Sequence, residues 1–280
     1  MPSGSKQTLK TMRIAALPMY DLPEVAEETD ALWRGLSFRL RAAGVEGVPE
    51  RLQRGGDPCE LWRSPYLLFA QTCGFPLMHD FAGKLTVVAT PCYSARGCDG
   101  PNYRSLIVVR ADDPRSAVAE FRGAVAAINS EESHSGFNIL RWRVAQEGKA
   151  PFFARLERTG GHVSSLAAVR SGRADLAAID CVTFALLERH RPSAVTGVRI
   201  LEETAAAPGL PFVTATSTTG DELRLLRQAL ADTLADPALS DVCHVLLLKK
   251  VEEIPLGRYE MIRDFARQGA VALSPAPKPS

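Results

Sequence analysis

Short apolar runs that end in turn residues alternate with amphipathic stretches along most of this chain. The runs 13–17, 85–89 and 174–179 have the length and composition of buried strands. The stretch 25–43 carries leucines at helical spacing and is followed by Gly44, which is typical of a helix and its end. This alternation over 280 residues predicts an α/β protein with mostly parallel sheets, because parallel strands need a crossover connection.

Two extended segments divide the chain. Residues 103–110 and 208–215 are rich in strand-forming residues, and the block between them has strands and helices of its own. One of these helices is expected from Asp113 through Phe121. Two crossings of this kind predict two lobes with a cleft between them. The predicted division places residues 13–108 and 205–270 in lobe 1, residues 109–204 in lobe 2, and disordered segments at 1–12 and 271–280.

The charge balance excludes some classes of function. Lysine and arginine total 33 against 32 aspartate and glutamate residues, a formal net charge of +1. Nucleic-acid-binding and membrane-surface proteins usually carry a basic excess or patch, so the sequence argues against both. No apolar run approaches the roughly 20 residues that span a bilayer. The polar segment 1–13 has no apolar signal-peptide core, so we expect a cytoplasmic chain or one whose leader was replaced or left out.

The six cysteines form no C-x-x-C pair and no zinc-binding spacing. Only Cys92 and Cys98 are close enough in sequence to suggest a local disulfide, and reduced, buried cysteines are the alternative. The motifs G-x-S-x-G, G-x-G-x-x-G, the P-loop and H-E-x-x-H are all missing. We therefore predict no catalytic residue, no metal site and no cofactor.

The stretch from Asn129 to Asn138 has the pattern of an anion-binding turn. A buried strand is expected at 124–128, a loop rich in hydroxyl residues follows it, and a helix is expected to begin near Ser135 or Gly136. The first turn of a helix offers free N–H groups and a positive dipole end, and serine hydroxyls can donate beside them. The alternative is that a serine of this loop only caps the helix.

Polar and aromatic residues follow the predicted strands at the points where those strands end. In an open parallel sheet, ligands bind beyond these carboxyl ends, so we expect such residues to converge on a small polar ligand. The predicted ligand-binding residues are Tyr20, Asp21, Gln71, Thr72, Cys73, Tyr93, Asn129, Ser133, His134, Ser135, Gly136, His162 and Asp180. Each has a structural alternative: the tyrosines can be packing residues, His162 can be structural, and Asp180 can cap the helix after it. The spacing of Ser133, His162 and Asp180 does not support a nucleophilic triad.

Five short motifs in this order resemble a known family. They are Leu17-Pro18-Met19-Tyr20-Asp21, Gln71-Thr72-Cys73-Gly74, Ser133-His134-Ser135-Gly136, Thr159-Gly160-Gly161-His162 and Ala174-Asp175-Leu176-Ala177-Ala178-Ile179-Asp180. Over about residues 13–260 the chain resembles the phosphate/phosphonate-binding (PhnD-like) substrate-binding proteins of ABC transporters, which have the type II periplasmic binding protein fold. The resemblance implies two Rossmann-like α/β lobes, a two-strand hinge and closure around a small oxyanion.

The resemblance also implies roles for single residues. Ser133, His134 and Ser135 match the turn that holds the phosphonate, with His134 in place of a hydroxyl residue. His162 matches a histidine that meets the oxyanion, and Asp180 matches a carboxylate position suited to a ligand amine. The tyrosines at 20 and 93 match aromatic cleft walls.

The leading hypothesis is therefore a solute-binding protein that captures a small anionic ligand for an ABC permease and catalyses no reaction. We expect a monomer that binds no nucleic acid and meets the membrane only through the permease. The resemblance implies a periplasmic location, whereas the polar N-terminus leaves a cytoplasmic location open. The alternatives are an enzyme of the same fold that acts on a small metabolite, and a ligand-sensing domain.

Overall fold

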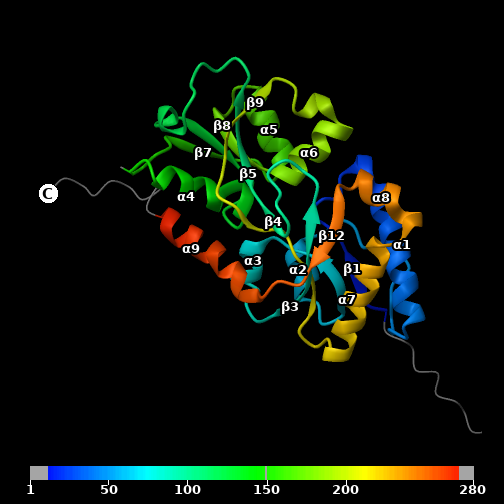
Figure 1. Cartoon of the computed structure of the whole chain (residues 1–280). Helices are drawn as coiled ribbons and strands as arrows, with labels where there is room; N and C mark the ends of the chain where they lie inside the picture. The colour runs from blue at the N-terminus through cyan, green and yellow to red at the C-terminus, as the bar shows by residue number, and fades with distance from the viewer. Residues whose placement is uncertain (1–11, 149, 271–280) are drawn as a thin grey trace, which may run out of the picture.

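The computed structural model describes residues 12–148 and 150–270, and its first lobe is built on a five-stranded mixed sheet (Figure 1). The strand order is β1-β2-β11-β3-β12. The strands are β1 (Ile14–Ala16), β2 (Leu67–Gln71), β3 (Leu85–Tyr93), β11 (Phe212–Ala215) and β12 (Leu248–Glu252). The helices of this lobe are α1 (Ala26–Ala42), α2 (Pro58–Arg63), α3 (Gly74–Met78), α7 (Gly220–Leu234) and α8 (Ser240–Val245), with 3₁₀ turns η1 (Pro23–Val25), η5 (Pro237–Leu239) and η6 (Leu256–Tyr259).

The second lobe is built on another five-stranded mixed sheet, in the order β7-β6-β8-β5-β9. The strands are β5 (Ser105–Arg110), β6 (Val125–Ile128), β7 (Arg155–Arg158), β8 (Leu176–Asp180) and β9 (Val198–Glu203). The helices are α4 (Ile139–Ala145), α5 (His162–Arg170) and α6 (Cys181–His190), with 3₁₀ turns η2 (Val118–Phe121) and η4 (Pro192–Ala194) and a π-helical turn η3 (His134–Asn138).

A two-stranded antiparallel sheet connects the lobes. It pairs β4 (Asn102–Tyr103) with β10 (Ala207–Pro208), and each strand leads directly into the next lobe. These are the two crossings that the sequence predicts at 103–110 and 208–215. The predicted boundary at residue 108 falls inside β5, whose residues all pair in the second sheet. The division of the chain into domains stays a prediction, and residues 1–11 and 271–280 lie outside the described residues.

The α/β class is as predicted, but the prediction of mostly parallel sheets is wrong. Only β1 with β2 and β6 with β7 and β8 pair in parallel. The strands β11 and β5 are antiparallel to both of their neighbours. Both strands return from the opposite lobe through the hinge, so they enter their sheets from the reverse direction. An antiparallel strand of this origin needs no crossover helix within its lobe.

The predicted helix from Asp113 through Phe121 is reduced to the short turn η2. The Asp113 carboxylate accepts hydrogen bonds from the backbone N–H and the guanidinium of Arg115, at 3.0 and 2.6 Å. The Glu120 carboxylate accepts the backbone N–H groups of Ser116 and Ala117. Side chains that bond nearby backbone groups compete with the helical pattern, so residues 113–117 form a turn.

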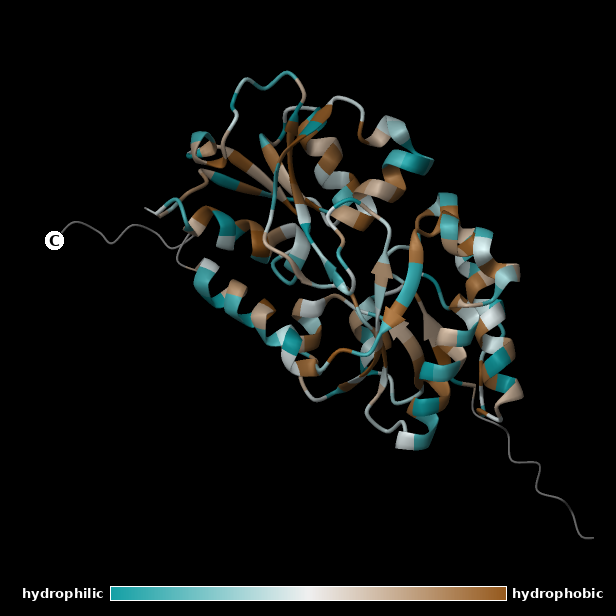
Figure 2. Cartoon of the chain, in the orientation of Figure 1, coloured by the Kyte–Doolittle hydropathy of each residue, from teal (hydrophilic) through white to brown (hydrophobic). Residues whose placement is uncertain are grey.

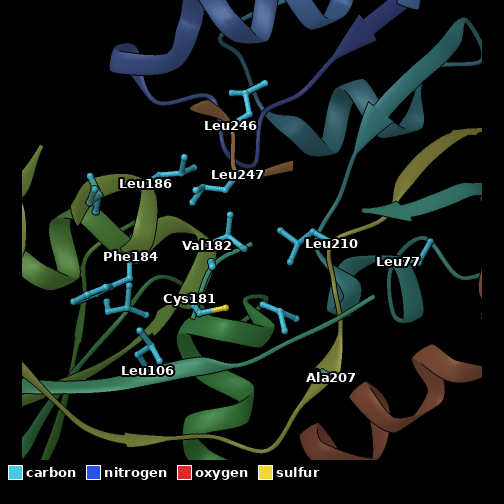
Figure 3. Close-up of a cluster of buried hydrophobic side chains, with 14 of the residues drawn as sticks. Leu77, Leu106, Cys181, Val182, Phe184, Leu186, Ala207, Leu210, Leu246 and Leu247 are labelled. Atoms are coloured by element: carbon cyan, nitrogen blue, oxygen red, sulfur yellow. The ribbon is translucent and has the colours of Figure 1, made fainter. Parts of the chain in front are cut away.

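Each lobe has its own apolar layer, and a third cluster joins the lobes. Trp33, Phe69 and Leu230 belong to the first lobe's layer, and apolar residues of β5, α4 and η2 form the layer in the second lobe. The third cluster draws on both sheets, and Figure 3 shows Leu186 of α6 near Leu246 and Leu247 of the first lobe. Apolar residues concentrate on the strands and on one side of most helices (Figure 2). The two lobes are therefore in direct apolar contact with each other.

The C-terminal helix α9 (Glu260–Gly269) contacts both lobes. It follows Tyr259, whose hydroxyl hydrogen-bonds Thr90 Oγ1 of the first sheet and donates to the Gly209 carbonyl. Along its length it packs on α3 of the first lobe and on α4 of the second (Figure 1). Among the described residues, no helix is long and apolar enough to cross a membrane.

All six cysteines are free thiols, so the pairing of Cys92 with Cys98 that the sequence suggested is not formed. Cys92 is buried in β3, whereas Cys98 lies in the connection that follows this strand. The Cys98 thiol instead lies beside that of Cys181, at 3.5 Å.

Candidate ligand-binding cleft

A cavity of about 280 Å³ lies between the lobes. The first lobe and its hinge segment contribute Pro18, Met19, Tyr20, Leu22, Cys73 and Leu210. The second lobe contributes Asn129, Ser133, Ser135, Gly160, Gly161, His162, Val163, Asp180 and Thr183. Seven of the predicted ligand-binding residues are in these two lists, and they come from segments far apart in the sequence. The cavity has the size of a small-molecule site.

The serine-rich turn after β6 forms one wall of the cavity. The Ser133 hydroxyl accepts the backbone N–H of Gly136 at 2.9 Å and so caps the η3 turn. This cap was the structural alternative for the turn, and it coexists with a position on the cavity. The side-chain amide of Asn138 donates to the backbone carbonyls of Glu131 and Ser133, and these two bonds fix the loop before the η3 turn. The π-helical start of α4 is a feature that recurs at functional sites.

Gly136 allows the turn to pack tightly against Asn129. A Cβ atom at Gly136 would lie 2.6 Å from the Asn129 side chain, which is closer than such contacts occur. Asn129 in turn accepts a hydrogen bond from the Ser165 hydroxyl at 3.3 Å. The glycine is therefore required by the close approach of two segments that line the same cavity.

The N-terminus of α5 forms the adjacent wall. No side chain caps this helix, so its first-turn N–H groups are free to bind an acceptor in the cavity. A Cβ atom at Gly160 or Gly161 would meet no atom within 4 Å, so the backbone there is open to the cavity. His162 Nε2 lies 3.0 Å from the Ser135 hydroxyl and joins the two walls. Burial lowers the pKa of His162 to about 4, which keeps the imidazole neutral at pH 7.

Asp180 lies at the carboxyl end of β8 and connects the lobes. One carboxylate oxygen accepts the N–H groups of Val182 and Thr183, so Asp180 caps α6 as the structural alternative predicts. The other oxygen accepts the hydroxyl of Tyr20, from the opposite lobe, at 2.9 Å. Burial raises the pKa of Asp180 to about 6, although these three donors oppose the shift.

Two other predicted residues, Tyr93 and Gln71, support Tyr20 on the side away from the cavity. Its ring packs edge-on against Tyr93, with ring centroids 5.2 Å apart. The Gln71 amide donates to the Tyr93 hydroxyl and to the Leu210 carbonyl. Gln71 and Tyr93 line a small separate cavity of about 30 Å³ behind Tyr20. They orient Tyr20 and do not line the main cavity.

Four other predicted residues lie away from the cavity. Asp21 forms an ion pair with Arg54 at 2.6 Å and faces a different depression. Thr72 is fully buried. His134 is buried behind the η3 turn, where it stacks on Phe265 of α9, and Gly136 packs on Asn129. Burial lowers the pKa of His134 to about 3, so its imidazole is neutral. The prediction that His134 faces the ligand does not agree with this geometry, because the turn presents the side chains on either side of it.

The arrangement does not form a catalytic triad. Ser135, not Ser133, is bonded to His162, and both Asp180 oxygens are occupied by other donors. His162 Nδ1 is buried and has no hydrogen-bond partner among the described residues, so no carboxylate orients the imidazole. A triad needs a carboxylate that orients the imidazole, so the site is better suited to hydrogen bonding than to proton transfer.

Several cavity residues were not predicted from the sequence. Val163 and Thr183 follow His162 and Asp180 in the first turns of α5 and α6, and Leu210 lies in the second hinge crossing. The available signal was position: residues in the first turn after a strand end face the same cleft as the strand end itself. Among the described residues that line the cavity there is no lysine or arginine. The groups that can bind a ligand there are hydrogen-bond donors, helix N-termini and the Asp180 carboxylate.

Comparisons with known proteins agree with this geometry. The binding protein component of an ABC phosphonate transporter from Pseudomonas aeruginosa superposes with a TM-score of 0.73 and 17% identity, over 91% of this chain and 85% of its own. PhnD1 from Prochlorococcus marinus, solved with methylphosphonate, gives 0.73 and 14%, over 92% and 98%. A Xanthomonas citri protein solved with ATP gives 0.70 and 17%, over 92% and 97%. No curated protein matches the sequence.

At these identities the solved structures show the shared fold, which is the two-lobed type II periplasmic binding protein fold. The family described as "ABC transporter, phosphonate, periplasmic substrate-binding protein" matches residues 67–255, more than half of the sequence. Both findings agree with the arrangement of lobes, hinge and cleft. The chain therefore belongs to the family of periplasmic phosphonate-binding proteins, the solute-capturing components of ABC transporters.

Proposed function

We propose that this protein captures a small phosphonate-like oxyanion in the interlobe cavity and delivers it to an ABC permease from the periplasm. One observation carries the proposal: the η3 turn and the uncapped N-terminus of α5 meet at a single cavity. Helix N-termini favour negative charge, and their free N–H groups suit phosphoryl oxygens. The hydroxyls of Ser133 and Ser135 add hydrogen bonds, and an N–H at His162 Nε2 that donates to the Ser135 oxygen leaves the Ser135 proton for the ligand.

The opposite end of the cavity favours a ligand that also carries an amine. With a pKa of about 6, Asp180 is ionised at pH 7, and a carboxylate repels a dianion. An ammonium group on the ligand offsets this charge and bonds the carboxylate. The ligand that suits both ends is an aminoalkylphosphonate, with Tyr20 over it. The cavity volume of about 280 Å³ also leaves room for more than a bare phosphate.

Calorimetry with phosphate, methylphosphonate and aminoethylphosphonate tests this ligand class. We expect the tightest binding for aminoethylphosphonate and the weakest for phosphate. In the Asp180→Asn variant, the preference for the amine is expected to shrink. If no oxyanion bound and a neutral metabolite did, the assignment of the cavity to anions would be wrong.

The serine turn is tested by a matched pair of variants. Ser135→Ala removes a hydroxyl from the cavity, and loss of a hydrogen bond to a charged ligand is expected to weaken binding roughly tenfold or more. Ser130→Ala, in the same loop but away from the cavity, is the control and is expected to bind normally. Equal affinities of both variants would place the anion elsewhere.

The protein acts by binding and lobe closure, without turnover. The bonded pair Ser135 and His162 is the feature that an enzyme would use, so it defines the rival activity. Phosphorus NMR of the phosphonate during long incubation with the protein is expected to show no product. A product that disappears with the His162→Ala variant would establish the enzyme instead.

A further inference from the structure

Two thiols from distant parts of the chain lie next to each other, one of them on the residue that follows Asp180 of the ligand cavity. The sulfur atoms of Cys98 and Cys181 are 3.5 Å apart, although the residues are separated by 83 positions in the sequence. Cys98 belongs to the connection between β3 and β4, and Cys181 is the first residue of α6, directly after Asp180. Figure 3 shows Cys181 in the apolar cluster that joins the lobes. The pair therefore links a segment leaving the first sheet with one leaving the second.

The backbone segments that carry the two thiols lie close to each other, and hydrogen bonds hold each segment in place. A Cβ atom at Gly97 would lie 3.2 Å from Cys181 Cβ, and Gly97 has a φ of 87°, which favours glycine. The Cys98 N–H donates to the Ala95 carbonyl, and the Cys181 N–H donates to the Arg104 carbonyl. A disulfide needs side chains that point toward each other from nearby backbones, and this pair meets that condition.

We propose that Cys98 and Cys181 form a disulfide bond that ties the β3–β4 connection to the start of α6. The family to which the chain belongs is periplasmic, and disulfides form and persist in such oxidising compartments. Cys92 is the other partner available in sequence, but it is buried within β3 opposite Lys250 of β12, where the Glu252 carboxylate holds its thiol. The geometry assigns Cys98 to Cys181.

The chemistry is a thiol–disulfide exchange with a small disulfide such as oxidised glutathione. Cys98 is half-buried and the more accessible thiol, whereas Cys181 is buried. The Cys98 thiolate attacks the glutathione disulfide, and one glutathione leaves as a thiol. Cys181 then loses its proton, attacks the Cys98 sulfur of the mixed disulfide and releases the second glutathione. Two protein thiols are oxidised and one glutathione disulfide is reduced to two thiols.

Oxidation of the reduced full chain with oxidised glutathione tests the pairing. The number of thiols titrated after denaturation is expected to fall from six to four. Tryptic cleavage separates the three cysteines involved, since Cys92 lies in fragment 85–96, Cys98 in 97–104 and Cys181 in 174–189. The expected cross-link joins 97–104 to 174–189. A cross-link between 85–96 and 97–104, or six thiols that persist, would overturn the proposal.

A thermal readout gives a second test that needs no ligand. A bond that closes a long loop restricts the unfolded chain, so oxidation is expected to raise the Tm by about 5 °C or more. The rise is expected in the wild type and in Cys92→Ser, and it is expected to vanish in Cys98→Ser and Cys181→Ser. The same rise in all three variants would contradict the assignment. Failure to bind phosphonates would leave these outcomes unchanged.

Discussion

At the scale of single residues, several side chains that line the cavity also stabilise the local structure around it. Ser133 caps a helical turn, and Asp180 caps α6 while it accepts the hydroxyl of Tyr20 from the other lobe. A residue with both tasks cannot be replaced without a change in local structure. Informative variants are therefore those that keep the shape and change one property.

Replacing Gly136 by alanine tests the close packing beneath the turn. The new Cβ would lie 2.6 Å from the Asn129 side chain, so the turn or Asn129 must shift. Overpacking of this kind is expected to cost about 1–3 kcal/mol in the free energy of unfolding and to weaken ligand binding. Chemical denaturation and calorimetry measure both effects. Gly220→Ala is the control, because a Cβ there meets nothing within 4 Å, and an equal loss in the control would contradict the packing argument.

Replacing Asp180 by asparagine tests the buried carboxyl group. Its pKa in the folded protein, about 6, is above its ordinary value of 3.8, so folding favours the protonated form. The stability that Asp180 contributes is present at low pH and is lost as the pH rises from about 4 to 6. The stability of Asp180→Asn relative to wild type is therefore expected to increase over this range, by at most roughly 3 kcal/mol.

Urea denaturation of both proteins at pH 4, 5, 6 and 7 measures this difference. His162 changes in the opposite sense, because burial lowers its pKa to about 4, but it is present in both proteins and cancels. A difference that stays constant with pH would show that Asp180 has no raised pKa.

At the scale of elements, the sequence predicted those parts that local pattern determines. The helix at 25–43 and the strand before Asp180 are present as α1 and β8, because periodicity and buried runs define them directly. The reversal of β5 and β11 was missed, since strand direction depends on which lobe the chain comes from and not on local composition. The short helices α2, α3 and α8 have too few turns to show a period.

In the binding site, too, local sequence pattern predicted some residues correctly, whereas contacts between distant residues could not be predicted. Position at strand ends identified Tyr20, Ser135 and Asp180. It also included His134, because the neighbouring positions of a turn look alike in sequence although their side chains point in different directions. His134 is buried against Phe265, which lies 131 positions later in the sequence, and a local sequence pattern cannot predict a contact over that separation.

The contact between α9 and the binding turn gives an element-scale prediction. Phe265 stacks on His134 with centroids 5.9 Å apart and packs on Trp142 at 4.7 Å. Phe265→Ala removes this half-buried support, and we expect a loss of about 2 kcal/mol in stability and weaker ligand binding. Arg267→Ala, on the exposed face of the same helix, is the control. Normal ligand affinity in Phe265→Ala would show that α9 does not support the turn.

At the scale of the whole molecule, α6 fastens the second lobe to the first on one side of the hinge. The Arg191 guanidinium forms an ion pair with Glu24 of η1, and the Arg189 guanidinium donates to the His244 carbonyl. The Arg191 guanidinium also lowers the pKa of Glu24. Both contacts join lobes and must break when the cleft opens.

Arg191→Ala is therefore expected to favour the open state. A partly exposed ion pair contributes up to about 1 kcal/mol, so ligand affinity is expected to fall two- to fivefold through faster dissociation. Stopped-flow kinetics measure the dissociation rate. Arg173→Ala breaks an ion pair with Glu157 inside the second lobe and is the control. Equal dissociation rates in both variants would show that the Arg191 ion pair does not stabilise the closed state.

The position of α9 has a mechanical consequence for opening. In Figure 1, α9 lies on one side of the hinge strands, and α6 and α8, which the Arg189–His244 hydrogen bond joins, lie on the other. Because α9 packs on α3 of the first lobe and on α4 of the second, separation of α6 from α8 must disturb at least one of these two contacts. A Cβ at Gly269 would already lie 2.7 Å from Arg141 of α4, so little space remains there. The side chains of Arg141 and Trp142 also donate to Ala266 and Gln268 of α9, so α9 connects the two lobes and must repack when the angle between them changes.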